Sequence, residues 1–193
     1  MNFDTKFLDN LIDAEKKIWS FFVQGTVNKK SYFNSPSLGS FNKNIFSIRT
    51  LILRKAIHAE RLLTFYSDIR SRKISDILVN DKVVIHVYDK KKNMQVQCYG
   101  KAKIISNCKE SKMIWNKLSN NSKKNYASKK KPGSKTDTTS LGQLVEKENA
   151  FKNFCIINLY VKNIICLHLL KGNNKKAQFN YNKNDFSSSW LVP

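Results

Sequence analysis

Short apolar segments separated by turn-forming residues run along most of the chain, and they limit the folds it can adopt. Apolar and β-branched residues recur in short runs between residues 36 and 105 and again between 151 and 181, with Asn- and Lys-rich turns between the runs. Such a succession, with few helical patterns in between, is typical of an antiparallel sheet or barrel. We therefore predict a mainly β (α+β) protein. Its strands are expected at 36–41, 45–54, 62–67, 82–88 and 94–105, twice within 151–170, and at 177–181.

Helical periodicity is clearest at the N-terminus. Residues from about 4 to 23 place an apolar, aromatic stripe on one helical face and charged residues, Glu15 among them, on the other. We expect Asp4 to cap this helix and the stripe to cover the open side of the sheet. Shorter helices are predicted at 71–79 and 106–118.

Length and charge narrow the class of protein. A chain of 193 residues is long enough for one domain with a substantial core, and we predict a single domain with its barrel at about 33–182. The formal net charge of +21 is typical of proteins that bind nucleic acid or anionic membranes. The excess is nearly all lysine, spread from end to end among many asparagines, so it is a weak functional signal.

Cysteine usage and hydropathy point to a cytoplasmic protein. The four cysteines have no C-x-x-C spacing and no nearby histidine pair, so no metal site is predicted. Three of them lie in apolar, strand-like runs, which fits a reducing compartment. Acidic residues near the N-terminus argue against a signal peptide. The most apolar stretch, Cys155–Leu170, is interrupted by polar residues and is too short to span a bilayer.

A lysine-rich segment at about 120–139 has a different character. It contains Pro132-Gly133 and no apolar periodicity, so we expect a flexible loop, either a solvated insertion or a mobile lid. As a nucleic-acid contact it lacks the interleaved aromatic residues that base stacking needs, Tyr126 aside.

Positive charge also gathers at strand ends and at a helix start. Arg49 and Arg54 lie at the ends of one motif, and Arg70, Arg72 and Lys73 lie where the next helix opens. A helix N-terminus attracts anions, and cations in its first turn are unfavourable unless an anion is bound there. The pattern favours a site for a phosphorylated ligand. The alternative is a surface hairpin with scattered solvated charge.

This stretch resembles the FMN site of the pyridoxamine 5′-phosphate oxidase-like split-barrel family. The family pattern is an Arg-x-Val-x-Leu-Lys/Arg strand, then Phe-Tyr/His-Thr-Asn/Asp-x-x-Ser-x-Lys leading into a helix. The chain has Arg49-Thr50-Leu51-Ile52-Leu53-Arg54 and Phe65-Tyr66-Ser67-Asp68-Ile69-Arg70-Ser71-Arg72-Lys73 at those positions. Further matches are Gln95 ahead of Gly100-Lys101-Ala102 and the tail Trp190-Leu191-Val192-Pro193. The likeness covers residues 33–105 well and the C-terminal third loosely.

The resemblance implies a six-stranded antiparallel split β-barrel with flanking helices, an FMN cofactor, and a homodimer with FMN in the cleft between subunits. It implies that Arg49, Arg72 and Lys73 hold the phosphate. Tyr66 and Ser67 would contact the phosphate and ribityl chain, and Gln95 the flavin ring. The implied cofactor-binding residues are Arg49, Thr50, Leu51, Ile52, Arg54, Tyr66, Ser67, Arg72, Lys73 and Gln95.

The substrate-binding half of the family pattern is missing. True pyridoxamine phosphate oxidases bind the substrate phosphate with a set of residues that falls at Met113, Lys117 and Asn121 in this chain. Their C-terminal Arg-x-His motif falls near Asn174 and Lys176. Their flavin-contacting Trp and Arg fall at His168 and Gln178. Vitamin B6 oxidation is therefore not predicted. The catalytic residues and the small-molecule substrate stay unassigned, with Arg54 as a candidate anchor for an anionic substrate.

Three functions remain open from the sequence. The first is an FMN-dependent oxidoreductase. The second is a flavin- or haem-binding protein without turnover, for which His168 is the residue to test. The third is a basic nucleic-acid-binding β-barrel, which rests on the net charge and the lysine-rich segment.

Overall fold

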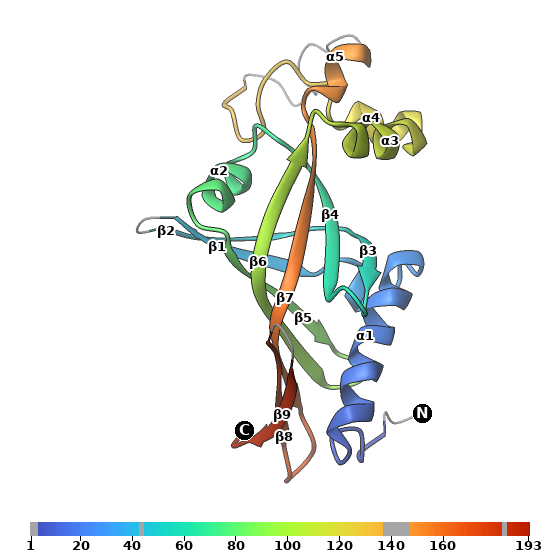
Figure 1. Ribbon diagram of the computed structural model, residues 1–193, viewed down its shortest axis with the longest axis vertical. Helices are drawn as coiled ribbons and strands as arrows, with labels where there is room; N and C mark the ends of the chain where they lie inside the picture. Colours follow the sequence, from blue (N-terminus) through green and yellow to red (C-terminus); the bar gives the residue numbers. More distant parts are fainter. Residues whose placement is uncertain (1–3, 43–44, 137–146, 183–184) are drawn as a thin grey trace.

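The computed structural model describes residues 4–42, 45–136, 147–182 and 185–193. One large antiparallel sheet runs through the molecule, and helices lie along its side and at its ends (Figure 1). The elements in chain order are α1 (Leu11–Val27), the 3₁₀ turn η1 (Tyr32–Asn34), β1 (Ser37–Asn42), β2 (Ile45–Thr50), β3 (Leu53–Ile57), β4 (Leu62–Asp68), α2 (Arg72–Val79), β5 (Lys82–Asp89), β6 (Met94–Ser106), α3 (Lys109–Lys117), α4 (Asn120–Lys124), α5 (Lys147–Phe151), β7 (Phe154–His168), β8 (Lys175–Tyr181) and β9 (Phe186–Leu191).

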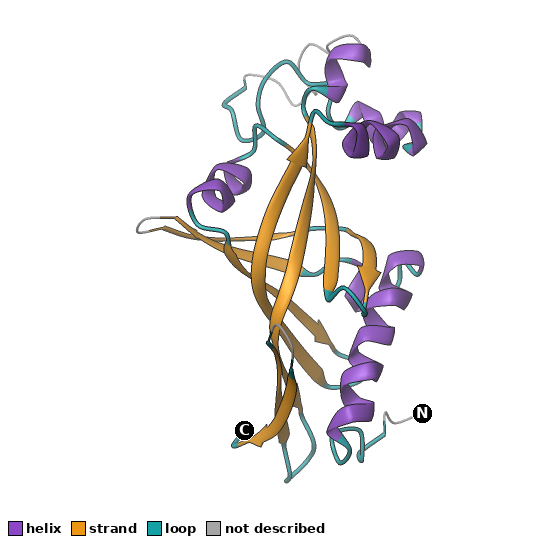
Figure 2. Cartoon of the chain, viewed as in Figure 1, coloured by secondary structure: helices purple, strands orange, loops and turns teal. Residues whose placement is uncertain are grey.

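The strand order is β2–β1–β5–β6–β7–β4–β3, and β8 and β9 extend the sheet from β7. The long strands β6 and β7 pair along almost their whole length. On its other side β7 pairs first with β4 and then with β8, so the sheet divides in two halfway along β7 (Figure 2). The expected antiparallel, mainly β architecture with flanking helices is confirmed. The described sheet has nine strands, whereas the resemblance implied six, and it is not closed by pairing between β2 and β3.

A β-bulge lies where β7 changes partner. Lys162 is the extra residue, opposite the step from Tyr99 to Gly100 in β6. A Cβ atom on Gly100 would lie 2.2 Å from the carbonyl oxygen of Tyr160, so the two strands approach closely only because this residue is glycine. The expected division of 151–170 into two strands is wrong, because a bulge absorbs one extra residue without ending the strand.

The expected single strand at 45–54 is two strands in the structure. β2 pairs with β1, β3 pairs with β4, and the chain passes between them at Leu51 and Ile52. The backbone N–H of Leu51 donates to the carbonyl oxygen of Pro36 at 2.9 Å, and the Leu51 side chain is buried. Sequence patterns could not show the break, because an apolar link between two strands resembles the interior of one strand. The expected turn at 42–44 lies partly outside the described residues.

Helix α1 begins later than expected. It runs over Leu11–Val27 rather than about 4–23, and Asn10 is the N-cap instead of Asp4. The Asn10 side-chain oxygen accepts two backbone N–H groups of the first turn at 3.1 and 3.2 Å. Both residue types are good caps, so the sequence alone could not choose between them. The aromatic stripe, including the fully buried Phe22, covers the sheet as predicted.

Glu15 is buried, although the helical pattern placed it on the solvent face. The Tyr181 hydroxyl donates to Glu15 Oε1, and Trp19 Nε1 donates to the Tyr181 oxygen at 2.8 Å. His58 Nε2 lies 2.9 Å from the same carboxylate oxygen. Burial, with the Glu15 hydrogen bond, raises the pKa of Tyr181, so the phenol stays a donor. The network fastens α1 to β8 and to the β3–β4 turn.

A second, smaller apolar cluster lies at the end of the sheet where β7 begins. Trp115 of α3, Tyr126 and Phe154 form its centre, and their rings contact one another edge to face or tilted. No helix in the described part of the chain combines the length and apolar character needed to cross a membrane.

Candidate functional site

The candidate site lies where the start of α2 meets the β1–β2 hairpin (Figure 1). Ser71 is the N-cap and α2 begins at Arg72, one residue after the predicted start. The Ser71 hydroxyl does not cap the helix, because it donates to the carbonyl oxygen of Asp68 at 2.7 Å. The first turn contains no acidic residue and carries Arg72 and Lys73. The positive end of the helix dipole and two cationic side chains therefore belong to the same turn.

Lys73 turns back toward the end of β4. Its Nζ donates to Ser71 Oγ at 3.0 Å and to Ser67 Oγ at 3.3 Å, and both serines are buried. Burial lowers the pKa of Lys73, and the positive charge of Arg49 lowers it further. Lys73 is thus a partly desolvated cation whose hydrogen bonds in the described structure go to hydroxyl groups.

Arg49 reaches the same place from β2. Its Nη1 donates to Ser40 Oγ of β1 at 2.6 Å, and its Nη2 lies 3.6 Å from Asp76 Oδ2. Asp76, on α2, is only 2% exposed and also accepts from the Ser40 hydroxyl and the Asn42 amide at 3.4 and 3.3 Å. Burial lowers the pKa of Arg49; Asp76 opposes this shift and Arg72 adds to it. The guanidinium is therefore fixed in place and close to other cations.

The charges of this cluster do not balance. Three cations, Arg49, Arg72 and Lys73, face one carboxylate, Asp76, which leaves a formal charge of +2. Asp68 also acts on Lys73, but Arg70 holds that carboxylate in a two-pronged pair at 3.0 and 2.6 Å, and counting both Asp68 and Arg70 leaves the sum unchanged. A phosphate monoester carries close to two negative charges, so the residues present fit such a group in charge and in hydrogen-bond donors.

A second pair of predicted residues lies further along β3 and β4. Arg54 is at a bulge in β3, where a side chain is redirected, and its guanidinium lies 5.5 Å from the centre of the Tyr66 ring. Tyr66 in turn packs edge to face on Phe154 at 5.3 Å. Burial raises the pKa of Tyr66 while Arg54 lowers it, so burial dominates. Arg54 is exposed and thus available to a ligand.

Four predicted residues form no side-chain hydrogen bond or ion pair with this cluster within the described residues. Thr50 ends β2, Leu51 is buried in the link to β3, and Ile52 is 41% exposed. Gln95 lies near the start of β6, in register with Tyr88 of β5. Helix α2 packs on β1 and on β6, and it precedes Lys82, which pairs with Lys101 in the later part of β6. Within one chain, Gln95 therefore lies toward the opposite end of the sheet.

Sequence reasoning missed Asp76 and Ser40, which contact Arg49, and Asn42, whose amide donates to Asp76. The spacing Arg72–Asp76 on one helix face could have suggested an acid near the cations. Nothing in the sequence showed that Ser40 would face it, because that depends on the β1–β2 register, in which Ser40 pairs with Ser47.

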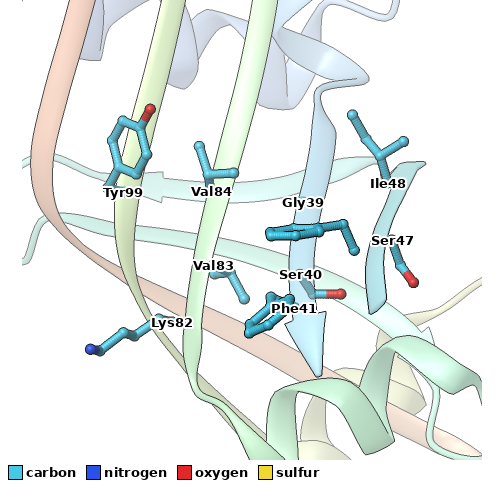
Figure 3. A pocket seen from close by; sticks show the side chains of 10 residues that line it. Gly39, Ser40, Phe41, Ser47, Ile48, Lys82, Val83, Val84 and Tyr99 are labelled. Carbon is cyan, nitrogen blue, oxygen red and sulfur yellow. The ribbon is translucent and has the colours of Figure 1, made fainter. Parts of the chain in front are cut away.

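The outer face of the same hairpin is apolar. Ile48, Gly39, Val84 and Tyr99 are in register across β2, β1, β5 and β6 and line a cavity of about 410 Å³ (Figure 3). Ile48 is 73% exposed and the neighbouring Phe46 is 83% exposed. Arg49 bonds to the inner face, so the charged cluster and the apolar surface lie on opposite faces of one hairpin.

The structure also locates the described part of the lysine-rich segment and His168. Asn120–Lys124 form α4, so the expectation of a loop is wrong there, and residues 137–139 lie outside the described residues. His168 ends β7, is 2% exposed and packs edge to face against Phe7. It is in register with Met94, at the end of the sheet away from α2.

Residues 16–106 match the family described as pyridoxamine 5′-phosphate oxidase, FMN-binding domain, and this range contains all of the predicted cofactor-binding residues. No curated protein matches the chain.

Solved structures with the same fold cover the whole chain. One is a pyridoxamine 5′-phosphate oxidase-related, FMN-binding protein from Nostoc punctiforme, with 17% identity, 100% of each chain covered and a TM-score of 0.76. Another is PhzG from Burkholderia lata in complex with tetrahydrophenazine-1-carboxylic acid, with 14% identity, 98% of this chain and 97% of that chain covered, and a TM-score of 0.75. General Stress Protein 26 from Bacillus anthracis has 20% identity and a TM-score of 0.52 over 79% of this chain and 92% of that chain. Residues 16–106 thus match the FMN-binding domain of the pyridoxamine 5′-phosphate oxidase family, and the chain as a whole shares the fold of these solved structures.

Proposed function

We propose that this protein binds FMN and acts as an oxidoreductase, with the cofactor phosphate held by Arg49, Arg72 and Lys73 at the start of α2. The observation that carries the proposal is the uncompensated charge of +2, formed by three cations and one carboxylate beside a helix N-terminus. A phosphate dianion would offset that charge and form charge-assisted hydrogen bonds.

Each residue has a role that follows from its surroundings. Lys73 and Arg49 supply donors whose positions are fixed by Ser71 and by Asp76. The Ser67 hydroxyl, hydrogen-bonded to Lys73, adds a polar group at the end of β4. Bound FMN would supply hydride or electron transfer, while the chain binds it, orients it and excludes water. Arg54 is the candidate anchor for an anionic substrate, because it is exposed on the Tyr66 side of the site.

We infer that a second copy of the chain completes the site. Phe46 and Ile48 expose a large apolar area on the hairpin that carries Arg49, and such areas mark interaction surfaces. Gln95 lies too far along β6 to join Arg49 and Lys73 within one chain. If it contacts the flavin, it does so from the partner. The proposed state is a homodimer with FMN at the interface.

The first experiment is the visible absorbance spectrum of the purified protein, with and without added FMN, beside an Arg72→Ala/Lys73→Ala variant. We expect flavin bands that survive desalting in the wild type, and an FMN affinity at least about 100-fold lower in the variant, because two charge-assisted interactions are lost. A Lys90→Ala/Lys91→Ala variant, changed in the exposed β5–β6 turn, is the matched control. A colourless wild type that does not bind FMN would contradict the proposal.

The dimer is tested by light scattering of an Ile48→Glu variant. A charge in the centre of an apolar interface is costly to desolvate, so we expect monomers and weaker FMN binding. Lys103→Glu, on an exposed position of β6, is the control for charge change. A variant that stays dimeric and keeps its FMN would place the interface elsewhere.

Turnover separates an oxidoreductase from a flavin-binding protein without activity. We expect bleaching of the flavin bands by a reduced nicotinamide and reoxidation by a second substrate. Vitamin B6 compounds are not proposed as substrates, because Met113, Lys117 and Asn121 stand where the family's phosphate-binding residues would be. Free thiols at all four cysteines fit the proposed cytoplasmic location.

A further inference from the structure

The lysine-rich segment is attached next to the cluster of Arg49, Arg72 and Lys73. Arg70, two residues before Arg72, donates through Nη1 to the carbonyl oxygens of Ser128 and Lys129 at 2.9 and 3.2 Å. The same guanidinium is held by Asp68 through its other two nitrogens. Arg70 therefore connects the turn that begins α2 to the middle of the lysine-rich segment.

A second attachment comes from Tyr126. It is 8% exposed and packs edge to face on Phe154 at 5.2 Å, and Phe154 also contacts Tyr66 of the candidate FMN site. The carbonyl oxygen of Tyr126 accepts from the Asn153 amide at 2.8 Å. Arg54, which lies over the Tyr66 ring, also influences the pKa of Tyr126 electrostatically. The segment is thus attached both to Arg70 and to Phe154, which packs on Tyr66.

The charge of this part of the chain is one-sided. The lysine-rich segment at 120–139 contains six lysines and one acidic residue, Asp137. Lys129, Lys130, Lys131 and Lys135 are exposed. Arg70 holds the backbone carbonyl of Lys129, and Lys130 Nζ donates to the carbonyl oxygen of Lys135 at 3.3 Å. Lysine is a flexible point charge, which suits recognition of negative charge rather than of one fixed geometry.

The aromatic residues nearby do not suit nucleic acid. Trp115 and Tyr126 are 5% and 8% exposed, so their faces are used in packing. Single-stranded nucleic acid needs aromatic faces on which bases can stack. A small polyanion needs only the exposed ammonium groups.

We propose that Lys129, Lys130 and Lys131 form a second anion site beside the FMN phosphate, and that it binds the pyrophosphate or paired phosphates of a small-molecule substrate. This rests on the proposed function, because it assigns a substrate class to the same site. The FMN phosphate binds to Arg49, Arg72 and Lys73, and the three lysines bind the negatively charged groups of the second ligand.

The test is calorimetric titration of FMN-saturated protein with inorganic pyrophosphate and with inorganic phosphate, at about 0.1 M salt. We expect pyrophosphate to bind about tenfold more tightly than phosphate, because it carries more charge within reach of several lysines. Lys129→Gln/Lys130→Gln/Lys131→Gln should weaken pyrophosphate binding about tenfold and change FMN affinity less than about twofold. The matched control Lys90→Gln/Lys91→Gln/Lys171→Gln removes the same charge from exposed positions at the other end of the sheet. It should leave both affinities nearly unchanged.

Each of the other outcomes contradicts either the second anion site or the proposed FMN-dependent function. No loss in the Lys129 variant, or an equal loss in the control, overturns the second anion site. Tighter binding of a single-stranded oligonucleotide of about 12 nucleotides, lost in the Lys129 variant, overturns it in favour of nucleic acid. A wild type without FMN contradicts the proposed function instead, and the same titration of the flavin-free protein then still tests the lysines.

Discussion

Two basic regions lie toward opposite ends of the sheet, and their charges are arranged differently (Figure 1). Around α2, Arg49, Arg72 and Lys73 lie close together, and Asp76 pairs with Arg49. At the other end, a cavity of about 610 Å³ beside His168 is lined by several lysines. The lysines there include two in ion pairs, Lys92 with Asp89 at 2.6 Å and Lys175 with Asp9.

The difference shows why net charge is a poor guide to function in this protein. A total of +21 is compatible with many partners, and much of it is spread or locally paired. Charge that burial has partly desolvated and that no acid balances indicates where an anion would bind. The α2 region meets both conditions, because burial lowers the pKa of Arg49 and of Lys73.

The largest effect is expected from Asp76→Asn. Without the buried carboxylate, Arg49 loses its ion pair and the three cations repel, so the flavin-free protein should lose about 3 kcal/mol of unfolding free energy. Added inorganic phosphate should restore more stability to the variant than it adds to the wild type. Urea denaturation with and without phosphate measures both. The exposed Asp81–Lys101 pair is the control, and Asp81→Asn should cost at most about 0.5 kcal/mol. Equal losses in the two variants would remove the distinction between the regions.

Arg70→Gln should release the lysine-rich segment. The variant loses the pair with Asp68 and the bonds to Ser128 and Lys129, so trypsin should cleave near residues 129–131 about tenfold faster, as expected for roughly 1.4 kcal/mol less protection. Arg61→Gln also removes a bond to a backbone carbonyl, that of Asn182, but at a different part of the sheet. Unchanged cleavage in Arg70→Gln would show that Tyr126 alone holds the segment.

A smaller effect is expected from pH acting on Lys73. The pKa of Lys73 lies below the ordinary 10.5, so Lys73 loses its charge at a lower pH than an exposed lysine. FMN affinity should therefore fall up to about tenfold as the pH rises through the lowered pKa of Lys73. Lys73→Arg stays charged and should not show this fall, and comparing the two removes any titration of FMN itself. Flavin fluorescence quenching from pH 7.5 to 10 measures the ratio.

The same shift has the opposite sign for stability without ligand. The unfolded chain holds the Lys73 proton more tightly than the folded one, so the unfolding free energy should rise with pH between the lowered pKa and 10.5. A pH dependence shared by Lys73→Arg would assign both effects to another group.

The smallest effect is expected from Lys175→Gln in the balanced region. Its ion pair with Asp9 is partly exposed, so its loss should cost less than about 1 kcal/mol and leave FMN affinity unchanged. Urea denaturation and the FMN titration together check this. A clear loss of FMN affinity would mean that the two ends of the sheet are not independent.

Local patterns were sufficient for much of the fold. Strands β5 and β6 and helix α2 agree with the sequence to within one residue at each end, because alternation and capping depend on residues only a few positions apart. The patterns failed where two elements compete locally, as at Asp4 and Asn10, or where a strand changes partner, as at Leu51 and Lys162.

The sequence by itself determined which side chains carry the candidate site's positive charge, since Arg49, Arg72 and Lys73 lie at a strand end and a helix start. Only the tertiary structure decided what surrounds them. The β1–β2 register brings Ser40 to Asp76 and both to Arg49. Long-range packing attaches the lysine-rich segment through Arg70. These partners lie 36, 9 and 58 residues apart along the chain. No local propensity encodes such contacts, because they form only when the whole sheet fixes its register.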